Sequence, residues 1–190
     1  QHNPINIAKS ISTLDVISGG RFEMGIGYGW NREEMFHHGV EFSTRRERVR
    51  ETMLAVKQLW TEEEAEFHGE FIDFDPSWAW PKPVKEKGPR VMLGGAPGPT
   101  IFQHIAEFGN GWMPIGGSGI KASLSDLQKV CESKERDFSE ISIIPFGTVP
   151  DQGKLDYFEE LGVDEVILRV PAGPREHVLE TLDSYVSFLK

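Results

Sequence analysis

Apolar positions along this chain follow two periods, and each period predicts a different kind of element. In the first twenty residues they recur every three or four positions, which predicts a helix that Asn3 caps and Pro4 opens. Gly19 and Gly20 end that helix, since glycine readily takes the left-handed conformation of a C-cap. Over residues 22–26 apolar positions alternate with polar residues or glycine, so this stretch is predicted to be a strand.

A second helix is predicted to begin near Thr44. Thr44 and Glu47 have the spacing of a capping box, and apolar residues then recur at helical spacing as far as Trp60. The helix has about four turns, and its apolar face, which includes Val49 and Met53, is predicted to enter the core.

An insertion at about residues 62–88 separates this helix from the next core strand. Residues 66–74 are predicted to form two short strands about Gly69, and residues 76–83 an irregular loop with two tryptophans. A connection of this length is uncommon unless it is functional, which favours a lid or a partner surface.

From Arg90 onward strands and helices alternate without interruption. A strand, a loop and a helix repeat, which is typical of a parallel sheet with right-handed crossovers. Five such strands are predicted in all, so the chain is either an open doubly wound α/β sheet or the last five units of an eight-stranded (β/α)8 TIM barrel. Beginning on a helix favours the barrel. The predicted strands are 91–93, 112–115, 141–146 and 166–170, and the helices are one opened by Pro99, one capped by Ser123, 152–161 and 175–189.

Length, charge and cysteine content narrow the class of protein. The 190 residues suit one domain over residues 1–190, and the formal net charge of −10 argues against nucleic-acid or anionic-membrane partners. Cys131 is the single cysteine, so no internal disulfide can form, and its helical context predicts a buried, inert thiol. No apolar run is long enough for a membrane span, and we expect a soluble, cytoplasmic protein.

Three predicted strands end in glycine-rich loops: Gly25 to Gly29, Gly94 to Gly98 and Gly116 to Gly119. In a parallel sheet these loops open on the same face, where exposed amides could hold a phosphate. The Gly-x-Gly-x-Gly spacing of the first loop is not the dinucleotide fingerprint. Its glycines are expected to free the backbone to take positive φ. Ligand binding and plain turn chemistry both remain open for these loops.

No motif supplies an obvious acid, base or nucleophile. There is no Gly-x-Ser-x-Gly elbow, and no carboxylate pair stands out by its spacing. His37 and His38 are predicted to lie on the surface, and no metal site is predicted. A glycine cradle without catalytic side chains suits an enzyme whose cofactor carries the chemistry.

A specific motif occupies residues 8–34, and shorter motifs follow it along nearly the whole chain. They include Leu14-Asp15-Val16-Ile17-Ser18-Gly19-Gly20-Arg21-Phe22, Gly25-Ile26-Gly27-Tyr28-Gly29-Trp30-Asn31-Arg32-Glu33-Glu34, Phe67-His68-Gly69-Glu70-Phe71, Leu93-Gly94-Gly95-Ala96 and Gly109-Asn110-Gly111-Trp112. Together they resemble the luciferase-like monooxygenases, the bacterial luciferase family of flavin- and deazaflavin-dependent oxidoreductases. The resemblance implies a TIM barrel that begins here at its third helix, without about its first three strands. It also implies that most of the chemistry lies outside this sequence.

The resemblance also implies which residues would contact the cofactor. These are Gly27, Tyr28, Gly29, Trp30, Asn31, Gly94, Gly95 and Ala96, and less directly Gly98, Gly116 and Gly117. Bacterial luciferase has a phosphate-binding arginine where this chain has Tyr28. That departure disfavours FMN and favours the deazaflavin coenzyme (factor 420).

The expected function is therefore a deazaflavin-dependent oxidoreductase that moves a hydride between its coenzyme and a small-molecule organic substrate. The alternative is an FMN-dependent monooxygenase that uses molecular oxygen. A third reading, from another class, is a non-catalytic fragment or binding module, because five of eight strands would leave open sheet edges that invite self-association. The resemblance suggests a homodimer.

Overall fold

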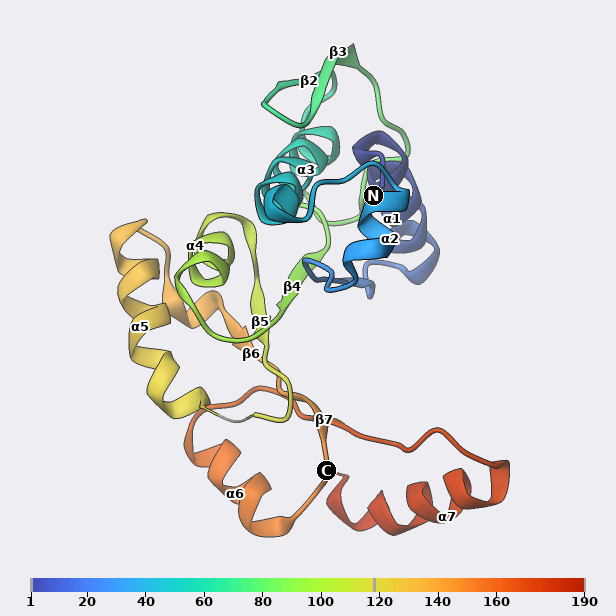
Figure 1. Cartoon of the computed structure of the whole chain (residues 1–190), viewed down its shortest axis with the longest axis vertical. Coiled ribbons are helices and arrows are strands. Elements are labelled where there is room, and N and C mark those ends of the chain that lie inside the picture. The colour runs from blue at the N-terminus through green and yellow to red at the C-terminus, as the bar shows by residue number, and fades with distance from the viewer. Residues whose placement is uncertain (1, 118, 190) are drawn as a thin grey trace. The chain divides into compact units, whose positions relative to one another are not determined.

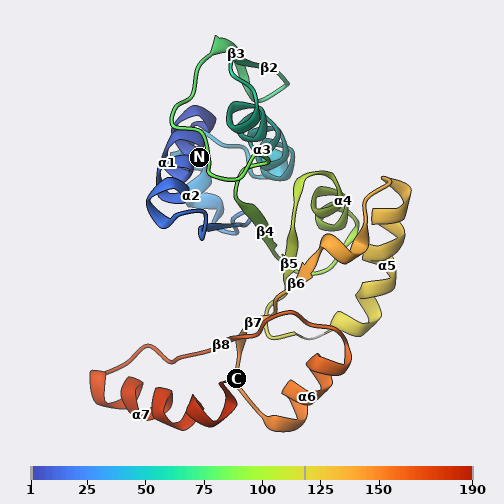
Figure 2. The same ribbon diagram turned by 180° about the vertical axis from the view of Figure 1, so that it is seen from behind.

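A computed structural model describes residues 2–117 and 119–189 of the chain (Figures 1 and 2). They group into two compact units. The first unit comprises Gln1–Leu93 with Glu107–Gly109, and the second comprises Gly94–Ala106 with Asn110–Lys190. Of the loop predicted at residues 116–119, Ser118 lies outside the described residues.

The first helix and strand form as their sequence predicts. Helix α1 spans Pro4–Ser18, and the Asn3 side chain caps it by accepting hydrogen bonds from the backbone N–H groups of Ile5 and Asn6. Gly19 ends the helix at a φ of 65°, and strand β1 follows at Glu23–Ile26. Both caps are therefore confirmed.

Helix α3, Arg45–Thr61, begins in a different way from the predicted capping box. A 3-10 turn at Phe42–Thr44 runs directly into it, and Thr44 is itself helical, with φ −86° and ψ −8°. The Thr44 hydroxyl donates to the Glu41 carbonyl at 2.9 Å, and Glu47 pairs with Arg50 instead. The capping-box prediction is wrong, because a Thr that continues a helical turn cannot fold its hydroxyl back onto the next turn.

Helices α1 and α3 pack together in the first unit, and both views show them side by side (Figures 1 and 2). The Trp60 indole donates to the Ala8 carbonyl at 3.1 Å, and both side chains are buried. Met53, Val56 and Leu59 complete the buried face of α3. Helix α2, Arg32–His37, is a short element between β1 and α3 in the chain. His37 and His38 are exposed as predicted.

The insertion contains the predicted hairpin. Strands β2, Ala65–His68, and β3, Asp73–Ser77, pair antiparallel. Buried Glu51 of α3 accepts three hydrogen bonds from the backbone N–H groups of the turn, Glu70, Phe71 and Ile72, at 2.7–2.9 Å. A carboxylate that fills its lone pairs with backbone donors can be buried at little cost, so the hairpin is fixed to α3.

Strand β4, Arg90–Gly94, pairs parallel to β1, with Glu23 opposite Arg90 and Ile26 opposite Leu93. In the second unit, strand β5, Gly111–Met113, pairs parallel to β6, Ser142–Ile143, and β7, Phe146–Thr148, pairs parallel to β8, Ile167–Leu168. The helices that follow these strands are α4, Pro99–Phe108, α5, Ile120–Ser133, α6, Gln152–Glu160, and α7, Arg175–Tyr185, with 3-10 turns at Phe138–Glu140 and Val186–Phe188. The predicted α/β alternation is confirmed.

Two predictions in the second unit are wrong in detail. The strand expected at 141–146 is divided into β6 and β7 at Pro145, which has no N–H to donate to a ladder. Ser123 does not cap α5, because that helix begins three residues earlier, after Gly119 at a φ of 78°. The Ser123 hydroxyl instead donates to the Gly119 carbonyl at 2.9 Å.

The core of the second unit forms around Trp112, which is fully buried and meets Phe102 edge to face. Cys131 is also fully buried, and burial raises the pKa of its thiol. A neutral, inaccessible thiol is a poor nucleophile, which agrees with the predicted inert role.

Candidate functional site

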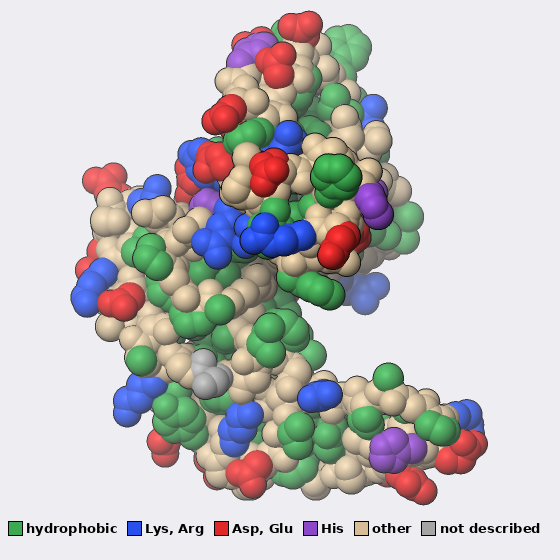
Figure 3. Space-filling model, in the orientation of Figure 1, with side chains coloured by type: hydrophobic (Ala, Val, Ile, Leu, Met, Phe, Trp, Pro, Cys, Tyr) green, Lys and Arg blue, Asp and Glu red, His purple; other side chains and the backbone are tan. Residues whose placement is uncertain are grey.

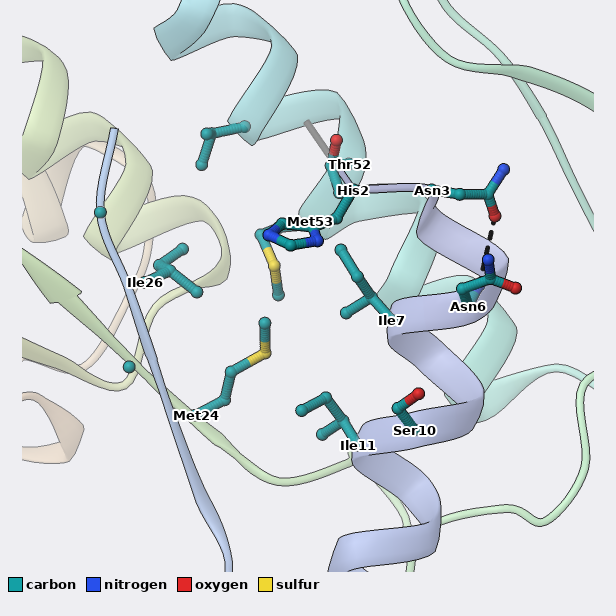
Figure 4. A pocket seen from close by; sticks show the side chains of 13 residues that line it. His2, Asn3, Asn6, Ile7, Ser10, Ile11, Met24, Ile26, Thr52 and Met53 are labelled. Carbon is teal, nitrogen blue, oxygen red and sulfur yellow. Dashed lines mark hydrogen bonds between the residues drawn. The ribbon is translucent and has the colours of Figure 1, made fainter. Parts of the chain in front are cut away.

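A cavity of about 810 Å³ lies between α1, β1 and α3 in the first unit. Its apolar side chains include Ile7, Ile11, Met24, Ile26 and Met53, which point toward one another in Figure 4. Of the predicted cofactor residues, this cavity contains only Gly27. Among the described residues, the lining carries no Lys or Arg side chain and includes His2.

A second cavity of the same unit, of about 330 Å³, is lined by the loop that the sequence singled out. Gly27, Tyr28, Gly29, Trp30 and Asn31 all border it. The structure therefore brings the first five predicted site residues together around one hollow. Its volume is at the lower end of the range for small-molecule sites. Helix α3 forms the opposite wall with Arg45, Arg48, Val49 and Thr52.

The glycines of this loop do not all have the role that we expected. Gly29 takes a φ of 75°, and a Cβ there would clash with the Met35 side chain. Gly25 lies instead in regular strand β1, opposite Met92, so the expectation of a positive φ at Gly25 is wrong. Tight packing therefore explains Gly29 without a ligand.

The Asn31 side chain serves the fold first. Its Oδ1 accepts a hydrogen bond from the Glu34 backbone N–H at 3.2 Å and so caps α2. This contact fixes where the loop ends and orients the side-chain amide. Trp30 beside it is 85 % exposed at the rim of the cavity.

Tyr28 is half-buried in the part of the cavity lining that the Gly27–Asn31 loop forms. Burial raises the pKa of its phenol to about 12, while the nearby Arg46 acts in the opposite direction. The guanidinium carbon of Arg46 lies 5.7 Å from the ring centre. The phenol therefore stays protonated at physiological pH.

Arg45 and Arg48 are the site residues that sequence reasoning missed. The guanidinium of Arg45 stacks on Phe42 at 3.7 Å, and that of Arg48 lies 4.9 Å from the centre of Phe71. Both Nε atoms are buried and have no hydrogen-bond partner within the described part of the chain. Burial and the neighbouring Arg46 and Arg32 lower the pKa of Arg45. Figure 3 shows basic side chains gathered on this face of the first unit.

These arginines concentrate positive charge at one end of α3. The amino end of a helix carries the positive end of the helix dipole, which strengthens the positive potential there. The same dipole repels cationic side chains, so arginines in the first turn lower helix stability. Glu34 also borders the cavity and partly offsets the two cations. Arginines at positions 45 and 48 lie on one helix face, and that spacing was the signal that could have revealed them.

The remaining predicted residues belong to the second unit. Gly95 donates its N–H to the Met113 carbonyl and accepts from the Trp112 indole, and a Cβ there would press on Ile101. Gly117 has a φ of 78°, and a Cβ would clash with the Phe158 ring. Gly98 and Gly116 have open space around them, Gly94 ends β4 and Ala96 is exposed.

Two further features bear on the class of site. Across residues 2–117 and 119–189, no three His, Cys, Asp or Glu side chains gather in a way that could hold a metal ion. The helices in the same part of the chain are too short or too polar to cross a membrane. The smaller cavity of the first unit, with two half-buried arginines whose Nε atoms are buried and a neutral phenol, instead has the chemistry that suits the anionic part of an organic ligand.

The fold and this cavity define an α/β protein with a small cavity between the Gly27–Asn31 loop and α3. Residues 1–150 match the family model for luciferase-like monooxygenases, and the chain belongs to that family. An uncharacterised protein of Mycobacterium tuberculosis is 42% identical over 90% of this chain and 60% of its own length.

Two relatives carry names that state an activity. An F420-dependent glucose-6-phosphate dehydrogenase of Kineococcus radiotolerans is 32% identical over 63% of this chain and 35% of its own length. An FMNH(2)-dependent dimethylsulfone monooxygenase of Pseudomonas putida is 30% identical over 66% of this chain and 36% of its own. The chain thus spans less than two thirds of the length of these relatives.

Solved structures show the same fold. The monooxygenase RslO1 from Streptomyces bottropensis matches with a TM-score of 0.80 and 19% identity, over 99% of this chain and 74% of that one. An F420-dependent secondary alcohol dehydrogenase, solved with an F420-acetone adduct, also gives 0.80, at 14% identity, over 100% and 76%. The chain therefore has the TIM-barrel fold of luciferase-like proteins, as predicted, and contains about five of its strand-to-helix units.

Proposed function

We propose that this chain is the coenzyme-binding part of an oxidoreductase that uses the deazaflavin coenzyme to move a hydride to or from a small organic substrate. The observation that supports it is the pairing of the Gly27–Asn31 loop with Arg45 and Arg48 around one cavity. Relatives that depend on this coenzyme are among the proteins similar to the chain.

The residues of the cavity would bind and orient the coenzyme. Arg45 and Arg48 would hold an anionic oxygen of its phosphate-bearing tail, because a buried Nε–H without a hydrogen-bond partner gains from a charged acceptor. Arg45 would do so while its Nη1 donates to the Phe42 carbonyl at 2.7 Å. Tyr28, kept neutral by burial, would donate a hydrogen bond, and Trp30 would cover the rim with an aromatic face. When bound, the deazaflavin ring supplies the carbon that gives or takes the hydride.

An FMN-dependent monooxygenase is the second candidate, and one observation favours it. The sequence argument against FMN was the loss of a phosphate-binding cation at Tyr28. Arg45 and Arg48 line the same cavity as Tyr28, so positive charge is present there from another element. The FMNH(2)-dependent relative from Pseudomonas putida agrees with this alternative.

Titration of the purified chain with the deazaflavin coenzyme and with FMN, followed by ligand fluorescence, separates the candidates. The proposal expects tighter binding of the deazaflavin coenzyme, weakened by R45A and R48A and unchanged by R175A, a matched charge loss on exposed α7. Tighter binding of FMN would replace the leading candidate with the second. Binding of neither ligand would contradict both.

A further inference from the structure

The inserted hairpin lies against the same helix that carries the cavity arginines. Glu51, one turn after Arg48 on α3, is only 7 % exposed and holds the hairpin turn through three backbone N–H groups. The Phe71 ring projects from that turn and lies 4.9 Å from the guanidinium carbon of Arg48. Neighbouring residues on one face of α3 therefore make two contacts with the hairpin: Glu51 binds its backbone, and Arg48 packs against the Phe71 ring.

Arg48 has few other constraints. Its Nε is buried without a hydrogen-bond partner within the described residues, and no ion pair of Arg48 is recorded there. A long side chain held by neither hydrogen bond nor carboxylate has several rotamers, and fixing one of them costs entropy when a ligand binds. The Phe71 ring restricts that freedom, because a guanidinium lies favourably over an aromatic face.

We infer that the hairpin is a positioning element for the anion site, with Phe71 holding Arg48 in the orientation that faces the cavity. This inference rests on the proposed function. It gives the hairpin at residues 65–77 a role that does not require contact with the ligand. Phe42, which precedes α3 in the chain, contacts Arg45 in a similar way: the guanidinium carbon lies 3.7 Å from the ring centre.

The test is a double-mutant cycle with inorganic phosphate as the probe. The Nε–H resonance of Arg48 in proton–nitrogen NMR spectra reports both the ring above it and phosphate binding. F71A is expected to move this resonance and to raise the phosphate dissociation constant about 2- to 5-fold, the range for a cation–π contact. F71Y, which retains the ring, is expected to restore both. In the R48A background, F71A is expected to add nothing.

One control variant and the two single variants separate the outcomes. F74A removes a neighbouring hairpin ring, the one opposite Phe67 in the β2–β3 pair, whereas the ring over Arg48 is that of Phe71. It is expected to leave phosphate binding unchanged. Loss of binding in F74A equal to that in F71A would show a general effect of hairpin damage and would overturn the inference. Normal binding in F71A with weakened binding in R48A would overturn it too, while the anion site stands. Normal binding in R48A would instead remove the anion site of the proposed function.

Discussion

The glycine-rich loops of the two units look alike in sequence but have different surroundings. In the second unit, positions 95 and 117 favour glycine because Ile101 and Phe158 occupy the space that a side chain would need. In the first unit Gly29 is constrained in the same way by Met35. What distinguishes the first loop is the opposite wall of its cavity, where Arg45 and Arg48 have buried, unpartnered Nε atoms. Neighbouring charge, and not glycine spacing, distinguishes the candidate site at the first loop.

The largest expected effect concerns the packing role of glycine in the second unit. G117A should lower the free energy of unfolding by about 2–5 kcal/mol, because a left-handed φ and a clash with Phe158 both oppose a Cβ. G116A is the matched control, since its φ of 64° is also left-handed but its surroundings are open. We expect it to cost only about 1–2 kcal/mol. Urea unfolding measures both, and equal losses would contradict a packing role for Gly117.

The next effect concerns the charge of the first unit. R45A and R48A should each weaken binding of a phosphate-bearing coenzyme by about 10- to 100-fold, because each removes a charge-assisted hydrogen bond worth about 1.5–3 kcal/mol. Raising the salt concentration should reduce this difference. Isothermal calorimetry with each variant is the measurement. A loss of less than about 2-fold in both variants would show that the cavity binds no anion.

A smaller effect is expected from Tyr28. Its folded pKa of about 12 lies above the ordinary value of 10.0, so between these pH values the folded chain keeps a proton that the unfolded chain has lost. Stability from this group is therefore complete below pH 10, falls as the pH rises toward 12 and then levels off. Urea unfolding at several pH values should show a shallower decline for Y28F. The same slope in both proteins would contradict a buried, neutral phenol.

Local signals in the sequence predicted the elements well. Asn3, Pro4 and Gly19 act within one helical turn, so their effect on α1 can be read from the sequence. The parallel pairing follows from the alternation of strands and helices. Errors arose where two local signals competed, as when Pro145 divided a strand or when Thr44 continued a turn in place of capping a helix.

The candidate site was predicted in part. The Gly27–Asn31 loop was found from its sequence, and the structure gathers all five residues at one cavity. Arg45 and Arg48 were missed because their importance depends on tertiary burial beside that loop. The contact between Phe71 and Arg48 spans 23 positions of the chain, and no local pattern indicates it.

The most direct test of the account compares FMN with riboflavin, which has the same ring and lacks the phosphate. The account predicts that the chain binds FMN about 10- to 100-fold more tightly than riboflavin, and that the R45A/R48A double variant removes this preference. Equal affinity of the unaltered chain for the two ligands would contradict an anion site at the first loop.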